Sequence, residues 1–167
     1  MKGLAVKNLH EKIWGWEKKK RTMLRYIKPG DIFCFSFDEE SYCFGRIVAK
    51  ITFGHVAEIF NHMSSEPIID EEEIVESSRL IEPVILDSYS LFDRKAEGDW
   101  RIIGHQEEYV PEKFENVYFA YGLGHSCKIT DIWGNEKPIS EEEKNNYHLL
   151  SPKGDFKVKE LIKAKRG

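Results

Sequence analysis

The chain has 167 residues, the size of one domain with a single hydrophobic core. Hydrophobic residues make up 41% of it and charged residues 32%, which excludes a chain that is disordered throughout. A formal net charge of −4 excludes the global basic field that concentrates proteins on nucleic acid or anionic lipid, and no apolar run reaches the roughly 18 residues of a transmembrane helix.

The first predicted element is a basic helix region over residues 1–27. Between Asn8 and Arg25 apolar residues fall near helical spacing, and the basic block Lys18–Arg21 follows them, which predicts a short amphipathic helix. We expect the aromatic side of this helix to close one end of a β-core. The alternative is that Trp14 and Trp16, which have lysines nearby, grip a partner.

A β-hairpin is predicted from Lys28 to Val48. Pro29-Gly30 supplies a fixed φ followed by a permissive residue, so the chain turns sharply there. Residues 32–37 and 42–47 show the period of two that is typical of strands. The polar residues between them form the tip of a hairpin slightly longer than the tightest type, namely Asp38, Glu39, Glu40 and Ser41.

The middle of the chain alternates predicted strands with polar connections. Ile51–Phe60 fits either a third strand or a short helix. The acidic run within Pro67–Glu76 is typical of a solvated loop or a helix start. Strands are predicted at Pro83–Asp87 and Trp100–His105, and the strongest strand by propensity is Asn116–Tyr121.

The C-terminal part is predicted to end in helices. Cys127–Trp133 can run antiparallel to the preceding strand through a glycine-rich turn. Ser140 followed by Glu143 is a capping pattern that predicts a short helix to about Leu149. After the break at Pro152–Gly154, a final basic helix is predicted from apolar residues at helical spacing, namely Val158, Leu161 and Ile162.

These elements predict an α+β fold that is mostly β. Residues 28–134 form a β-rich core of about six or seven strands, arranged as a strongly bent antiparallel sheet or a small barrel. Short helices flank this core at both termini, and residues 135–167 form a helical tail. We expect residues 1–167 to form one domain.

The histidines do not predict a metal site, because none of the six has the spacing of a zinc-binding motif. His105, at a predicted strand end, and His125, in a glycine-rich turn, could face each other with Asp131 and perform acid/base chemistry as a hydrolase. The alternative, which we favour, is that each histidine donates to a backbone carbonyl. We therefore expect no catalytic residue, no metal and no cofactor, and a protein that is not an enzyme.

Another alternative is a small RNA-binding β-barrel. The block Lys18–Arg21 lies beside Trp14, Trp16 and Tyr26, and surfaces that bind single-stranded nucleic acid combine basic and aromatic residues in this way. The acidic residues elsewhere would repel a phosphate backbone. We therefore expect that nucleic acid is not the partner.

Three short motifs stand out along the chain: Pro29-Gly30-Asp31, Phe44-Gly45-Arg46 and Trp100-Arg101-Ile102-Ile103-Gly104. They resemble the immunity protein 26 family of bacterial polymorphic toxin systems, and the similarity extends over roughly Tyr26 to Gly122. The resemblance implies a mostly β immunity protein that binds the toxic domain of a cognate toxin in a contact-dependent or polymorphic toxin system. It would neutralise that domain by occluding its active site. A nuclease is one candidate for the toxin, and whether the protein is a homo-oligomer stays open.

Acidic residues are the predicted site for this toxin partner. They are expected to project from the hairpin tip and from the middle of the chain: Asp38, Glu39, Glu40, Asp70, Glu71, Glu72, Glu73 and Glu76. Such carboxylates could mimic the phosphate charge that a nuclease binds and raise the association rate. Affinity would need anchors, for which the candidates by residue type are Tyr89, Phe92, Tyr109 and Trp133. Each cluster could equally be a solvated surface.

The cysteines indicate the compartment. Cys34, Cys43 and Cys127 are odd in number and have no C-x-x-C spacing, which is typical of buried thiols in a reducing environment. The N-terminus lacks the apolar core of a signal peptide. We expect a cytoplasmic protein with no membrane partner.

Overall fold

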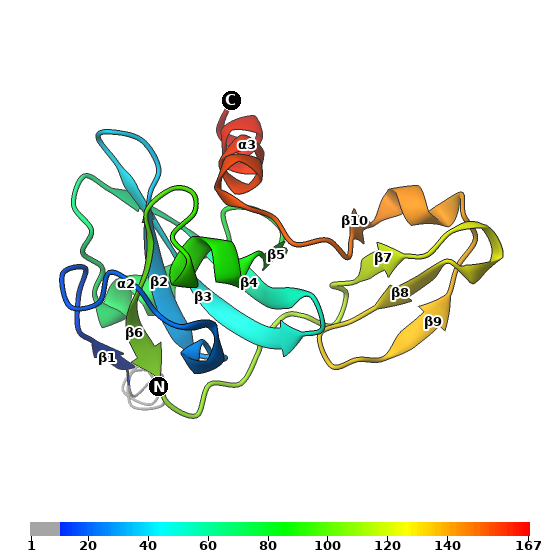
Figure 1. Ribbon diagram of the computed structural model, residues 1–167, viewed down its shortest axis with the longest axis horizontal. Coiled ribbons are helices and arrows are strands. Elements are labelled where there is room, and N and C mark those ends of the chain that lie inside the picture. Colours follow the sequence, from blue (N-terminus) through cyan, green and yellow to red (C-terminus); the bar gives the residue numbers. More distant parts are fainter. Residues whose placement is uncertain (1–10) are drawn as a thin grey trace.

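The computed structural model describes residues 11–167, which form two sheets at opposite ends of a long axis (Figure 1). The first sheet has the strand order β1-β6-β2-β3-β4-β5, and every neighbouring pair is antiparallel. Its strands are β1 (Glu11–Ile13), β2 (Asp31–Ser36), β3 (Tyr42–Ile51), β4 (Gly54–Ser64), β5 (Val84–Leu86) and β6 (Trp100–Gln106). Register shifts between β2 and β6 and between β3 and β4 bend this sheet.

The second sheet has the order β10-β7-β8-β9. Its strands are β7 (Phe119–Tyr121), β8 (Lys128–Thr130), β9 (Glu136–Pro138) and β10 (His148–Leu149). The strands β7, β8 and β9 pair antiparallel, whereas β10 is parallel to β7. The edge strand β9 is exposed along its length and ends in Pro138, which has no N–H to offer to a further strand.

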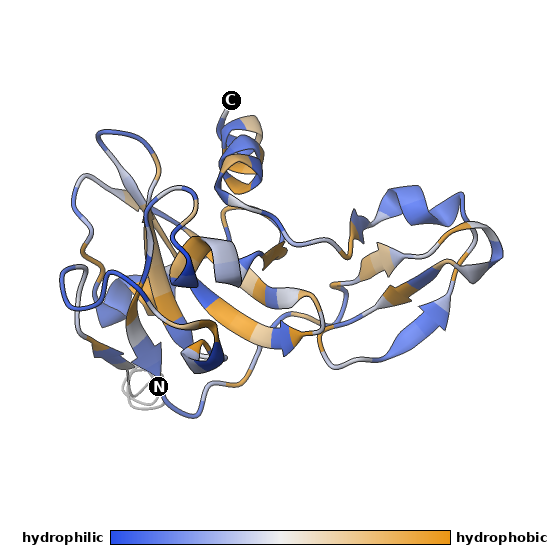
Figure 2. Cartoon of the chain, viewed as in Figure 1, coloured by the Kyte–Doolittle hydropathy of each residue, from blue (hydrophilic) through white to orange (hydrophobic). Residues whose placement is uncertain are grey.

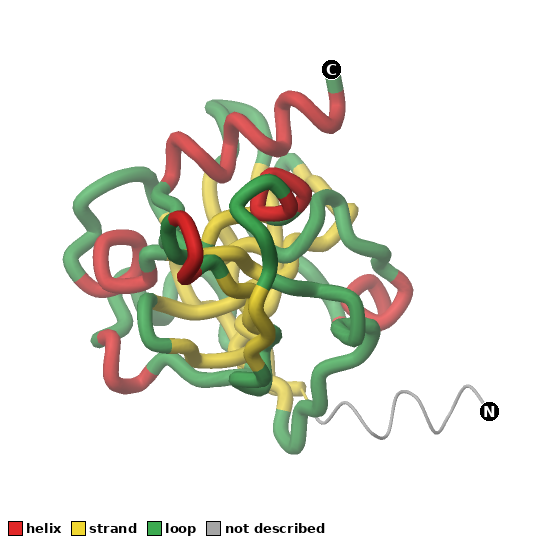
Figure 3. Tube along the Cα trace, turned by 90° about the vertical axis from the view of Figure 1, so that its right-hand side faces the viewer, coloured by secondary structure: helices red, strands yellow, loops and turns green. Residues whose placement is uncertain are grey.

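Along the chain, helical segments lie between the strands of both sheets, and one follows the last strand. They are the α-helices α2 (Glu71–Glu76) and α3 (Asp155–Arg166), the 3₁₀ turns Leu24–Tyr26, Gly124–Ser126 and Glu143–Asn146, and the π-helical turn Tyr89–Asp93. Figure 3 shows the strands in the interior and α3 crossing above them on its way to the C-terminus. Asp155 in the first turn of α3 and basic residues in its last turn complement the helix dipole.

The main core lies on one face of β2. Phe35 stacks on Trp100 with ring centroids 3.8 Å apart and an interplanar angle of 5°. Helix α3 closes this face with Val158 and Ile162, which are both 0% exposed. In Figure 2 the apolar residues accordingly concentrate on the inner strands of the first sheet.

A second core lies on the opposite face of β2. Ile32 and Cys34 pack there with Ile74, the buried residue of α2, and with the half-buried Trp16. Because both faces are covered, the polar Ser36 is the only residue of β2 that is not fully buried. Alternate side chains of β2 therefore point into two different cores, whereas in a half-buried strand one of the two sets would face solvent.

The structure confirms a mostly β fold with a C-terminal helix. The strands described in residues 11–167 form two open sheets and not a closed barrel. The described part of the chain has ten strands where about six or seven were expected, because β1, β9 and β10 are short and have little strand propensity. The ambiguous segment Ile51–Phe60 belongs mainly to β4, and the predicted hairpin is formed by β2 and β3.

The predicted N-terminal helix between Asn8 and Arg25 is wrong where the structure describes it, and its residues 8–10 lie outside the described part. Residues 11–13 form β1, and the backbone N–H groups of Trp14 and Gly15 donate to Ile103 at 2.8 and 3.0 Å. Pairing with β6 satisfies these donors, so tertiary contact overrides the helical spacing. The expectation that this segment closes the core is confirmed, because Trp14 packs against the main core.

The short helix predicted between Ser140 and Leu149 is also wrong in part. The capping contacts are present, with Ser140 and Glu143 exchanging hydrogen bonds of 2.9 and 3.0 Å. They start only a 3₁₀ turn, because the following residues join the second sheet as β10. Local capping chemistry thus begins the turn, and strand pairing ends it.

Candidate functional site

The two predicted acidic clusters lie at separate places on the first sheet. Asp38, Glu39 and Glu40 are exposed at the turn between β2 and β3, and Arg166 of α3 is close enough to act on the Asp38 carboxylate. The Asp70–Glu76 cluster instead consists of residues of α2 and its N-cap, Asp70. This helix packs on the face of the sheet opposite α3. The two clusters therefore do not form one continuous surface.

Three of the eight predicted carboxylates have structural roles. Asp70 and Glu73 form a reciprocal capping box at the start of α2, with hydrogen bonds of 2.8 and 3.0 Å. Asp38 accepts from the Ser41 hydroxyl and the Glu40 N–H, and these donors hold the pKa of Asp38 below its usual value. Of the remaining five, Glu71 is partly exposed and the others are exposed, namely Glu39, Glu40, Glu72 and Glu76.

A groove of ≈ 650 Å³ opens beside α2. One wall is formed by the end of α2 and the residues after it, 74–78, and the other by the loop that follows β6, residues 107–113. The floor consists of Arg46 from β3, Glu58 from β4 and Arg79, whose side chains are 15%, 8% and 24% exposed. We call this the α2 groove.

A single carboxylate holds the floor together. One oxygen of Glu58 accepts from Nε and Nη2 of Arg46 at 2.9 and 2.6 Å, and the other accepts from Nε of Arg79 at 3.0 Å. The remaining Nη1 of Arg46 donates to Gln106 at 2.8 Å. Charge-assisted bonds of this kind are short and directional, and removing Glu58 would leave two partly buried cations unpaired.

The floor also fixes the loop wall. Arg79 donates through its two terminal nitrogens to the backbone carbonyls of Glu112 and Lys113, both at 2.9 Å. The Arg46 guanidinium lies over the Tyr109 ring, 4.7 Å from its centroid. Each arginine therefore links the buried strands to the loop, and the shape of the groove is set before any partner arrives.

Two features of the loop wall cost free energy. Glu108 and Lys113 have φ angles of 53° and 64°, a left-handed conformation that is unfavourable for side chains other than glycine. The Tyr109 hydroxyl is buried and has no hydrogen-bond partner among the described residues, and burial raises the pKa of this phenol. The contacts of Arg46 and Arg79 maintain the loop in spite of these costs.

The rim of the groove combines apolar and acidic side chains. Val75 on α2 is 40% exposed and Val110 on the loop is 72% exposed. Glu71-Glu72 precede Val75 by one helical turn, and Glu108 and Glu112 lie on either side of Val110. Each exposed valine is therefore flanked by carboxylates.

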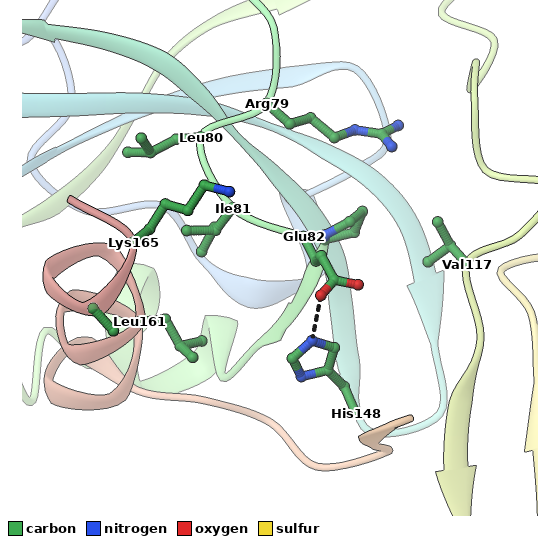
Figure 4. A pocket seen from close by; sticks show the side chains of 10 residues that line it. Arg79, Leu80, Ile81, Glu82, Val117, His148, Leu161 and Lys165 are labelled. Atoms are coloured by element: carbon green, nitrogen blue, oxygen red, sulfur yellow. Dashed lines mark hydrogen bonds and ion pairs between the residues drawn. The ribbon is translucent and has the colours of Figure 1, made fainter. Parts of the chain in front are cut away.

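A second groove, of ≈ 640 Å³, lies between α3 and the second sheet (Figure 4). Leu161 of α3 and Ile81 provide its apolar surface. Nε2 of His148 lies 3.3 Å from the carboxylate of Glu82 on its other side, and Lys165 adds a positive charge. Charges of both signs therefore line this groove, since Arg79 also reaches it.

The residues of the alternative hydrolase site are not brought together. His105 lies on β6 with its Nδ1 2.8 Å from the carboxylate of buried Asp31. His125 lies in the exposed 3₁₀ turn between β7 and β8, in the other sheet. Asp131 accepts the backbone N–H groups of Trp133 and Asn135 at 2.9 Å. The preference for histidine bonds to backbone carbonyls is wrong for His105, which pairs with a carboxylate.

The aromatic residues suggested as partner contacts differ in exposure. Phe92 is 0% exposed in the main core, so its prediction as an anchor is wrong. Tyr109 forms part of the α2 groove, while Tyr89 and Trp133 are half exposed.

The tryptophans of the alternative RNA surface are engaged within the protein. The Trp14 indole donates to the carbonyl of Ile102 at 3.0 Å, and the guanidinium of Arg101 lies 4.0 Å from the Trp16 ring centroid. These contacts fix the segment after β1 on the first sheet. A cation already lies over each ring where a base would stack, since the Lys19 ammonium is 4.7 Å from the Trp14 ring centroid.

The floor of the α2 groove was missed from the sequence. Arg46 was noted only within its motif, and Glu58 and Arg79 were not singled out. The available signal was Glu58 itself, because a carboxylate inside the apolar stretch Val56–Phe60 of a strand needs a buried partner.

Residues 11–167 contain neither a cluster of metal ligands nor a membrane-spanning helix. No group of three or more His, Cys, Asp or Glu side chains there could hold a metal ion. In the same part of the chain, no helix has the length and apolar character needed to cross a membrane.

Comparison with known families gives one match. A family model described as immunity protein 26 matches residues 28–131, well over half of the chain. The matched segment contains β2 to β8 and all residues of the α2 groove, whereas β1, β9, β10 and α3 lie outside it. No curated protein and no solved structure matches the chain.

Proposed function

The chain belongs to the immunity protein 26 family, and from this premise we propose that it neutralises a cognate bacterial toxin by binding its toxic domain. The family match over residues 28–131 is the observation that carries the proposal. The protein would act in the cytoplasm, and three free, buried thiols are compatible with that reducing compartment, namely Cys34, Cys43 and Cys127.

Inhibition would result from occlusion of the toxin's active site. A stable complex of this kind needs a complementary surface with a few well-packed anchors. The exposed carboxylates at the hairpin tip and around α2 would accelerate encounter with a basic toxin surface. They would add little affinity, because each exposed ion pair contributes about 0–1 kcal/mol.

We further propose that the toxin is a nuclease. An enzyme that binds nucleic acid presents a basic cleft, and carboxylates at that cleft would replace the phosphates of its substrate. The candidates are Glu39 and Glu40 on one side of the first sheet and Glu71, Glu72 and Glu76 on the other. If the toxin has another activity, the proposed immunity function stands, but phosphate mimicry no longer explains the acidic surface residues.

The proposal is tested by co-expression with the toxic domain encoded beside this protein. We expect growth to be restored and the two proteins to co-purify as a slowly dissociating complex. A toxic domain from an unrelated system is the control and should still kill the cells. Lack of both rescue and binding, with the toxin shown to be expressed, would refute the immunity function. Nuclease activity of the purified toxin domain is assayed separately.

A further inference from the structure

The α2 groove has the composition of a binding site for a cationic protein segment. Val75 and Val110 are exposed on opposite walls, and an apolar side chain placed between them would lose contact with water on both sides. Glu108 and Glu112 line the groove on either side of Val110 together with Lys113, and Glu72 precedes Val75 by one helical turn. An apolar centre inside a polar rim is the usual anatomy of a protein interface.

The groove is also preorganised. Glu58 bridges Arg46 and Arg79, and Arg79 holds the backbone of the loop wall through two hydrogen bonds. A partner that binds here does not have to order that wall, so less conformational entropy is lost on binding. The left-handed residues at both ends of the loop show that its shape is imposed by these contacts.

The other surfaces fit a basic partner less well. At the hairpin tip, the carboxylate of Asp38 is used within the turn and Arg166 of α3 lies nearby. The second groove carries Lys165 and the Glu82–His148 pair, so its charges are mixed. The lining of the α2 groove also includes cations, but Arg46 and Arg79 are engaged by Glu58 in the floor, which leaves Lys113 beside Glu108 and Glu112 and the acidic helix α2. Of these three surfaces it alone has strongly exposed valines next to these carboxylates.

We propose that the α2 groove is the docking site for a basic loop of the toxin domain. An aliphatic or aromatic side chain of that loop lies between Val75 and Val110, and lysine or arginine residues beside it face the carboxylates of α2 and of the loop wall. This inference rests on the proposed immunity function and assigns it to one face of the first sheet.

The apolar contact is tested with a double variant, Val75→Ser with Val110→Ser, and binding of the purified toxin domain is measured by calorimetry. We expect the dissociation constant to rise by about tenfold or more, because the central contact is lost. The matched control is Leu123→Ser with Leu149→Ser, which removes two apolar side chains that are 76% and 52% exposed and do not line the α2 groove. The control should bind within about twofold of the natural protein.

The charge contact is tested with Glu72→Lys and Glu76→Lys, and the competing surface at the hairpin tip is tested with Glu39→Lys and Glu40→Lys. Both double variants change the net charge equally at exposed positions. We expect only the α2 variant to lose most of the salt dependence of the association rate. Thermal unfolding of all four variants should stay close to that of the natural protein, which separates binding from folding.

The outcomes distinguish the two levels of the proposal. If the natural protein rescues growth but the α2 groove variants bind as tightly as their controls, the docking site is wrong and the immunity function stands. If the hairpin-tip variant alone loses binding, the docking site is at the other cluster. A shift of the protein alone from dimer to monomer on Val110→Ser would assign the groove to a second copy and overturn the proposal.

Discussion

The two sheets of this protein differ in how their strands are covered. In the first sheet, residues 31–35 of β2 are buried on both faces, whereas β9 of the second sheet is exposed at every residue. Figure 2 shows the same difference as apolar inner strands and a hydrophilic outer strand. The first sheet therefore contains most of the buried apolar area and should determine the stability of the fold.

The well-buried part of the molecule extends beyond the residues that match the family model. The match ends at residue 131, yet Val158 and Ile162 of α3 are fully buried in the main core. The segment before α3 also pairs with the end of β5. The N–H of Lys153 donates to the carbonyl of Ile85 at 2.8 Å, and the carbonyl of Lys153 accepts from the N–H of Asp87 at 2.9 Å. Residues outside the family match therefore complete the main core of the first sheet.

The largest expected effect is at Trp100. Its ring stacks on Phe35, and its indole donates to Asp155 of α3 at 2.8 Å. Replacing it by alanine, Trp100→Ala, should lower the free energy of unfolding by about 3–5 kcal/mol through loss of buried area and formation of a cavity. Urea denaturation measures this change. A loss below about 1 kcal/mol would contradict the assignment of stability to the first sheet.

A smaller but still large effect is expected at Ile162. The variant Ile162→Ala removes a fully buried side chain that lies outside the family match, and should cost about 2–4 kcal/mol in urea denaturation. Phe156→Ala is the control on the same helix, because Phe156 is 69% exposed. Equal, small effects of both changes would mean that α3 is dispensable for the core.

We expect the protonation of His55, in the first sheet, to make the free energy of unfolding depend on pH. This histidine is buried on β4 with its Nδ1 2.8 Å from the Ser88 hydroxyl, and burial lowers its pKa from 6.5 to about 4. The unfolded chain therefore takes up a proton at higher pH than the folded protein does. Stability present above pH 6.5 should be lost as the pH falls toward about 4, by about 3 kcal/mol in total.

Thermal unfolding between pH 7 and pH 4 measures this loss, and His55→Gln is the informative variant. Glutamine keeps hydrogen-bonding capacity but does not titrate, so the slope of stability against pH should flatten over this window. An unchanged slope would show that another group is responsible.

The smallest effect is expected in the second sheet at Trp133. The side chain is 55% exposed, so Trp133→Ala should change the free energy of unfolding by less than about 0.5 kcal/mol. The same variant should bind the toxin domain normally, since Trp133 does not line the α2 groove. A strong loss of binding would instead make the second sheet part of the interface.

The sequence predicted the first sheet better than the second because strong periodic patterns occur there. The alternation in β2 and β3 and the run from Trp100 to His105 gave the right strands. The short strands β1, β9 and β10 depend on tertiary pairing, for example that of residues 11–13 with β6, and no local signal reveals such pairing.

The candidate site was only partly predictable. The acidic residues of α2 are visible as a charge run, and their exposure follows from composition. The groove beside them depends on Glu58 meeting Arg46 and Arg79, which are separated from it by 12 and 21 positions in the chain. Such a network is specified by sheet register and loop closure, which a single sequence does not show.

Pro138 has a consequence for the behaviour of the protein at high concentration. An exposed edge strand normally offers unpaired N–H and C=O groups on which another chain can nucleate a β-ribbon. The last residue of β9 lacks the N–H group, and its neighbours on that strand are the charged Glu136 and Lys137. The outer edge of the second sheet therefore lacks one donor that an added strand would need and carries charges that oppose strand addition.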